Sequence, residues 1–134
     1  MNHVDVLRQV PLFASLTQDQ LSAAAVNFHT ESFAPDAIIF LEEHPGSIQD
    51  GYLEMGLTSP DFPDVPGALH GGSGGISFAD GHAIVRKWIT PVLLIPVTQG
   101  TTVHHAGTTI NGPMSATNPD WLWVRDHSSA PTPP

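Results

Sequence analysis

Apolar and polar positions follow two different periods along this chain, and the change of period separates its first part from the rest. Over residues 1–35, apolar side chains recur every three or four positions, as on one face of a helix: Leu21, Ala24, Ala25 and Phe28. Just before them, Thr17 and Gln20 have the spacing of a capping box, in which each side chain accepts a hydrogen bond from the other residue's backbone N–H. A shorter helix is expected at residues 4–10, because Pro11 cannot continue it.

Between residues 36 and 91 the apolar runs are short and bounded by turn residues, which is typical of β-strands. Residues 37–41, rich in Ile and Phe, indicate a buried strand, and residues 52–55 indicate a second one. Residues 57–67 contain three prolines and are predicted to be loop, since proline cannot donate to a strand ladder.

Asp80-Gly81 lies between two alternating segments, 75–79 and 82–88, and this is a strong signal for a two-residue hairpin turn. Such a turn would place Ala79 opposite His82. Four apolar residues would then share one face, which we assign to the core: Ile76, Phe78, Ala83 and Val85. His82 would lie on the face opposite Phe78.

The last part of the chain carries weaker signals. Residues 98–115 are rich in Thr and Gly and are predicted to be a long loop, in which His104 and His105 are a solvated pair. Residues 118–126 indicate a last short strand or helical turn that docks Trp121 and Trp123. The expected fold class is α+β: a helical segment at 1–35, a β-rich head with a small antiparallel sheet at 36–126, and a proline-rich tail at 127–134, disordered or in polyproline II.

Composition narrows the possible functions. The chain has 134 residues, 40% of them hydrophobic, and a net charge of -9, which argues against binding nucleic acid or an anionic membrane surface. It has no cysteine, so disulfides, thiol catalysis and cysteine zinc sites are excluded. No run approaches the length of a membrane helix and no signal-peptide pattern is present, so the chain as written is expected to be cytoplasmic with no membrane span.

The most distinctive motif is His70, nine residues, then Asp80-Gly81, followed by Arg86-Lys87-Trp88. With the segment at 39–51 before it and Asn-Pro-Asp-Trp-Leu-Trp after it, this order resembles the bacterial prepilin-like proteins named for their H-x9-D-G motif. The resemblance spans residues 36–134 and implies the globular head of a pseudopilin of a type II secretion or type IV pilus-like system. It implies a non-enzymatic structural protein whose partners are sister pilin-like subunits or secretion components.

That family begins with a short basic leader and a long apolar helix, and residues 1–35 match neither. If the N-terminus is truncated, the resemblance implies a cell-envelope or extracellular location. Pseudopilins as a class hold calcium in their C-terminal loops, so calcium is the cofactor that the resemblance implies.

A second resemblance offers an alternative. Residues 6–21 and 33–40 look like the first helices and first strand of a cyclic-nucleotide-binding domain, but the Gly-Glu and Arg cassette that holds the cyclic phosphate has no counterpart. The alternative is therefore a cytosolic cyclic-nucleotide-sensor-like fragment without a phosphate site.

Histidines and carboxylates suggest a metal site, because imidazole with carboxylate suits zinc and carboxylate oxygens suit calcium. The candidate ligands are His70, Asp80, His82 and Asp50, and a second set is Glu43, His44 and Asp50. A structural role is the other interpretation: Asp tolerates turns, and His70, Asp80, Gly81 and Trp88 would organise the head. The three tryptophans are expected to be core or to cover edges.

Enzymatic signatures are missing from the sequence. Glu42 and His44 would share a strand face, but no nucleophile elbow accompanies them. The glycines at 71, 72, 74 and 75 lack the Gly-Lys-Ser/Thr ending of a phosphate loop and lead into a strand. The sequence therefore predicts neither catalysis nor an organic cofactor.

Overall fold

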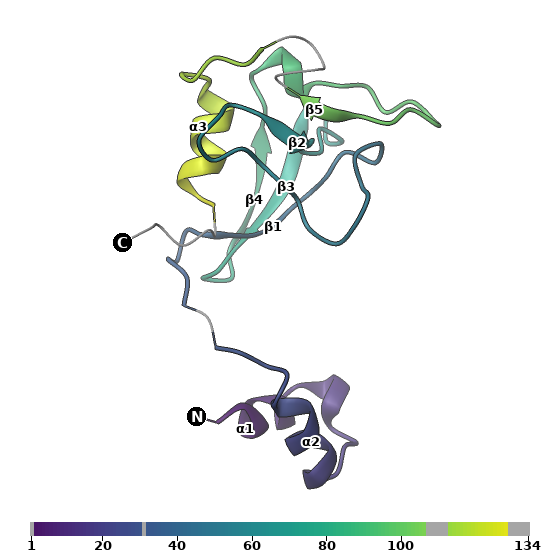
Figure 1. The fold of residues 1–134 in the computed structure, drawn as a ribbon, viewed down its shortest axis with the longest axis vertical. Coiled ribbons are helices and arrows are strands. Elements are labelled where there is room, and N and C mark those ends of the chain that lie inside the picture. The colour runs from purple at the N-terminus through teal and green to yellow at the C-terminus, as the bar shows by residue number, and fades with distance from the viewer. Residues whose placement is uncertain (1, 31, 107–112, 129–134) are drawn as a thin grey trace. The chain divides into compact units, whose positions relative to one another are not determined.

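Figure 1 shows the chain as a computed structural model, which describes residues 2–30, 32–106 and 113–128. The chain divides into two compact units, Met1–Ser32 and Phe33–Pro134, and each is described by itself. The predicted α+β class is confirmed: the described residues contain three α-helices and a small antiparallel sheet. Most of the predicted tail lies outside the described residues. No helix in the described ranges is long and apolar enough to cross a membrane.

The first unit contains α1 (His3–Arg8), a 3₁₀ turn (Pro11–Phe13) and α2 (Gln18–Ala25). The predicted capping box is confirmed: the Gln20 backbone N–H donates to Thr17 Oγ1 at 3.3 Å, and the Thr17 N–H donates to Gln20 Oε1 at 2.9 Å. Leu7 and Leu21 are the buried side chains of this unit. Phe28 lies beyond the end of α2, where its ring meets that of Phe13 edge to face.

The second unit is built on a three-stranded antiparallel sheet in the order β1-β3-β4, from β1 (Ile38–Leu41), β3 (Ser73–Phe78) and β4 (Ala83–Lys87). A separate antiparallel pair joins β2 (Phe62–Asp64) to β5 (His104–Ala106). Helix α3 (Pro119–Asp126) follows β5 in the chain and lies beside the sheet (Figure 1).

The β3–β4 hairpin is where expected, but its predicted register is wrong by one residue. Ser77 pairs with Ala83 and Ile76 with Ile84, because three residues, 79–81, form the connection. Gly81 closes that loop at φ 91°, its N–H donating to the Phe78 carbonyl at 3.0 Å, a geometry that only glycine adopts easily. A shift of one residue exchanges the two faces of a strand.

As a result, only half of the predicted core face is correct. Ile76 and Phe78 are buried, whereas Ala83 and Val85 lie on the opposite, exposed face. His82 lies on the same face as Phe78, and the two rings stack with their centroids 4.2 Å apart, which also corrects the prediction.

Three segments differ from their predicted structure. Residues 52–55 are not a strand, because side chains take the hydrogen bonds a ladder would use: the Tyr52 N–H donates to Asp50 and the Glu54 N–H to Asp64. The predicted loops at 57–67 and 98–115 contain β2 and β5, which pair with each other across the sequence. Residues 107–112 of the second loop lie outside the described residues.

Of the two structures predicted for residues 118–126, the helix is the correct one. Helix α3 packs on the inner face of the sheet, which carries Ile76 and Phe78. Asn118 caps it by accepting the backbone N–H groups of Asp120 and Trp121. Trp88 and Trp121 are 1% and 3% exposed, as expected of core tryptophans. The half-buried Trp123 meets the ring of Phe78 edge to face.

Candidate functional site

The H-x9-D-G motif spans the length of one strand. His70 precedes β3, Gly71 and Gly72 turn the chain at φ 63° and 86°, and Asp80-Gly81 closes the hairpin at the other end of β3. The nine intervening residues are thus a glycine turn, the strand itself and one residue of the hairpin loop. His70 and Asp80 lie at opposite ends of β3, so the motif is a framework for the hairpin.

His70 pairs with a carboxylate from the segment that follows β1. Its Nε2 lies 3.2 Å from Glu42 Oε2, and the same oxygen accepts the Gly75 backbone N–H at 3.0 Å. The His70 side chain is 56% exposed, so the pair stabilises the unit only weakly. It ties the start of the motif to the end of β1.

Asp80 and His82 form a second pair at the hairpin turn. Asp80 Oδ1 accepts the His82 backbone N–H at 3.1 Å and lies 2.5 Å from His82 Nδ1. The backbone N–H of His82, and then its ring, hold the pKa of the Asp80 carboxyl below its ordinary value. Asp80 therefore serves the turn, as the structural interpretation expected.

The candidate metal ligands do not meet as one set. Asp80 and His82 are in contact, His70 lies at the far end of β3, and Asp50 lines a pocket beside β1. Of the second set, His44 is 1% exposed, and its Nδ1 accepts the Gly46 N–H. Only its Nε2 is therefore left to bind a metal ion. Within the residues that the structure describes, no group of three or more histidines and carboxylates is arranged to hold a metal ion.

The outer face of the sheet, opposite α3, is apolar and open. Phe40 on β1 pairs with Ser77 on β3, which pairs with Ala83 on β4, and Val85 follows beside Gly75. Phe40 is 61% exposed and Val85 is 67% exposed. We call these five residues the outer face.

A buried charge pair, which sequence reasoning missed, joins α3 to β4. Asp120 has no exposed surface and accepts the backbone N–H groups of Ile89 and Thr90 at 2.9 and 2.8 Å. Arg86 Nη2 lies 3.4 Å from its other oxygen, and the guanidinium is 4.0 Å from the centroid of the Trp123 ring. This network positions α3 on the inner face. In the sequence, the only indication of this network is that Asp120 lies in the first turn of the helix that Asn118 caps.

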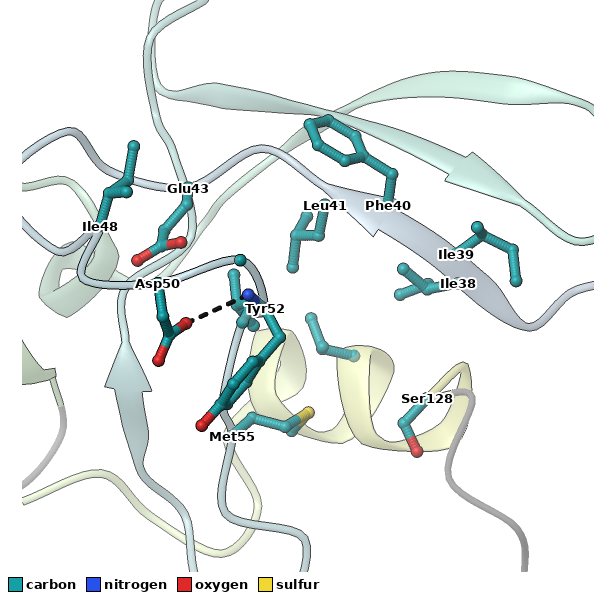
Figure 2. Close-up of a pocket in the computed structure, with 13 residues that line it drawn as sticks. Ile38, Ile39, Phe40, Leu41, Glu43, Ile48, Asp50, Tyr52, Met55 and Ser128 are labelled. Carbon is teal, nitrogen blue, oxygen red and sulfur yellow. Dashed lines mark hydrogen bonds between the residues drawn. The ribbon is translucent and has the colours of Figure 1, made fainter. Parts of the chain in front are cut away.

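A pocket of about 470 Å³ lies beside β1 (Figure 2). Glu43 and Asp50 lie at one end of it, with apolar side chains along the rest. Burial, opposed by a hydrogen bond with Ser47 and reinforced by Asp64 and Asp50, raises the pKa of Glu43 above its ordinary value of 4.5. We call this hollow the β1 pocket.

Comparison of the chain with protein-family models, with curated proteins and with solved structures finds no match.

Proposed function

We propose that this chain is a non-enzymatic structural protein whose second unit is an interaction head that packs against sister copies. The head would act like the globular head of a pseudopilin in a type II secretion or type IV pilus-like assembly. The H-x9-D-G order supports this proposal, and its residues have structural partners: Glu42 for His70, and His82 for Asp80. The proposal places the working protein in the cell envelope or outside the cell.

The outer face is the single observation that carries the proposal. Two large apolar side chains, Phe40 and Val85, stand exposed on it, and small residues lie between them. The Glu42–His70 pair and Lys87 border this surface. An apolar patch with a polar border is typical of a protein–protein contact, whereas single exposed apolar residues are ordinary.

The size of the outer face predicts how strong one contact is. Three strands about 4.8 Å apart and roughly five residues long cover about 14 Å by 17 Å, roughly a third of the area that each partner buries in a stable complex. One such contact is therefore weak. A subunit held in this way needs several neighbours, as in a filament.

The net negative charge of the chain also favours an apolar contact between copies. Each copy has a net charge of -9, so two copies repel each other and their contact has to be apolar. Salt screens that repulsion, and we therefore expect association to increase with ionic strength. A contact based on opposite charges would weaken instead.

Sedimentation velocity over a wide range of protein concentration tests the proposal. Phe40→Thr and Val85→Thr each place a β-branched residue, which suits a strand, and should reduce self-association. Val97→Thr is the matched control, since Val97 is 54% exposed and is not on the outer face. A chain that stays monomeric up to millimolar concentration in high salt would overturn the proposal, and so would equal effects of all three changes.

Calcium remains a prediction of the resemblance. A bound ion would raise the melting temperature by mass action. Millimolar calcium added to the full chain should therefore raise it, and an unchanged melting temperature would remove calcium from the proposal.

A further inference from the structure

The β1 pocket is formed by three parts of the second unit. Strand β1 forms one wall and residues 48–55 fold back to form another (Figure 2). Val124 of α3 also lines the pocket. Most of the lining is apolar and includes Ile38, Leu53 and Met55. A hollow of about 470 Å³ lies within the range of small-ligand sites.

The two carboxylates at one end of this pocket differ in how they are held. Asp50 Oδ1 accepts the Tyr52 backbone N–H at 3.1 Å. Glu43 Oε1 is buried and has no hydrogen-bond partner among the described residues. A buried acceptor without a donor is unfavourable, and a charged one especially so. The pocket thus has two carboxylates at one end, and one of them is incompletely hydrogen-bonded within the protein.

The apolar walls and the charged end together select one kind of occupant. An anion would be repelled by Glu43 and Asp50, and a neutral apolar molecule would leave both carboxylates without a positive partner. A bare metal ion lacks enough ligands, because the described residues hold no suitable group of three. A cation with an apolar body satisfies both parts of the pocket.

We infer that the β1 pocket binds a primary ammonium group carried on an apolar chain or ring, with the ammonium between Glu43 and Asp50. The ammonium pairs with the carboxylates of Glu43 and Asp50, and the apolar body lies against Leu53 and Met55. Tyr52, which is 68% exposed and also lines the pocket, offers its ring to the cation. This site adjoins the proposed contact between sister copies, because Phe40 lines the pocket and also belongs to the outer face.

Binding should depend on pH in a defined direction. The ammonium requires a Glu43 carboxylate, and the groups that act on Glu43 are Ser47, Asp64, Asp50 and His104. Because the pKa of Glu43 is raised, the carboxylate takes up a proton at a higher pH than an ordinary glutamate does. Affinity should therefore fall as the pH is lowered toward that pKa.

Methionine methyl NMR on the full chain tests the inference with three probes of similar size. The chain has three methionines, of which Met55 lines the pocket and Met114 packs against the core as an internal reference. 2-Phenylethylamine, which is cationic at neutral pH, should shift the Met55 signal in a saturable way. 2-Phenylethanol should bind about tenfold more weakly, and 3-phenylpropionate should not bind. Equal binding of amine and alcohol, or no Met55 shift with any probe, overturns the inference.

Three variants localise the charge contact. Glu43→Gln should weaken amine binding about tenfold and leave binding of the alcohol unchanged, and Asp50→Asn should weaken amine binding less. Asp36→Asn is the matched control, since it removes the same charge from an exposed position outside the pocket. If Glu43→Gln and Asp36→Asn have the same effect, the attraction is only the net charge of the protein and the proposed site is wrong.

Discussion

Replacing Asp120 by alanine tests most severely how the second unit is held together. This fully buried carboxylate accepts two backbone N–H groups, from Ile89 and Thr90, and faces the guanidinium of Arg86. Its removal leaves both N–H groups without an acceptor and leaves a largely buried positive charge without a partner. The change also removes a negative charge from the first turn of α3, where the helix dipole favours one.

The structure allows a magnitude for this loss. A buried N–H group without an acceptor costs about 1–3 kcal/mol, and breaking a buried ion pair from one side costs about 3–5 kcal/mol. The two costs share one carboxylate and overlap, so we expect the free energy of unfolding to fall by about 3–5 kcal/mol. This is a large share of the roughly 5–15 kcal/mol that stabilises a small domain.

Asp126→Ala on the same helix is the matched control. Its side chain is 57% exposed and pairs with Arg125 at 2.6 Å, a surface pair worth about 0–1 kcal/mol. Urea unfolding followed by tryptophan fluorescence measures both variants. Asp120→Asn keeps one oxygen acceptor and should fall between them, which keeps the test informative if Asp120→Ala does not fold. Losses for Asp120→Ala and Asp126→Ala within about 1 kcal/mol of each other would refute the reasoning.

Two further predictions concern stability. A Cβ at Gly74 would lie 2.5 Å from the Gly67 carbonyl oxygen, whereas a Cβ at Gly75 would meet nothing closer than 3.8 Å. Gly74→Ala should therefore lower the free energy of unfolding by about 1–3 kcal/mol, and Gly75→Ala should leave it nearly unchanged; equal losses would contradict the close approach. The raised pKa of Glu43 means that the folded chain binds this proton more tightly than the unfolded chain, so stability falls as pH rises through that pKa. Glu43→Gln should thus raise the melting temperature at neutral pH but not below about pH 4.5, and a gain that is equal at every pH would count against this assignment.

Local signals in the sequence predicted local structure well. Thr17 and Gln20 lie three positions apart and cap α2 as expected, because both partners of a capping box lie in one turn. The strand at β1 and the position of the β3–β4 hairpin were also predicted, since strand and turn preferences act over a few residues. The burial predicted for β1 is only half correct, because Ile39 and Phe40 are exposed.

The hairpin register depended on contacts that no local pattern contains. Gly81 fits the end of a two-residue or a three-residue loop. The Ala79 and Asp80 N–H groups donate to the carbonyls of Ala37 and Pro35, and the ring of Phe78 stacks on that of His82. The first of these interactions joins segments about forty residues apart, which spacing around the turn does not show.

The β1 pocket and the Arg86–Asp120 pair could not be predicted either, because both depend on contacts between segments far apart in the sequence. Glu43 and Asp50 were singled out as ionisable residues, but the β1 pocket exists because residues 48–55 return to β1. The Arg86–Asp120 pair links positions 34 residues apart, on a strand and on a helix. Only the tertiary fold brings such groups together.

We propose that copies of this chain meet at the outer face. A dilution series of amide NMR spectra on the full chain, in high salt, tests it most directly because it locates the contact. We expect the signals of four outer-face residues to move together with concentration, namely Phe40, Ser77, Ala83 and Val85. The signal of Val97 should stay in place. Signals that do not change up to millimolar concentration, or that move only away from the outer face, would contradict the claim.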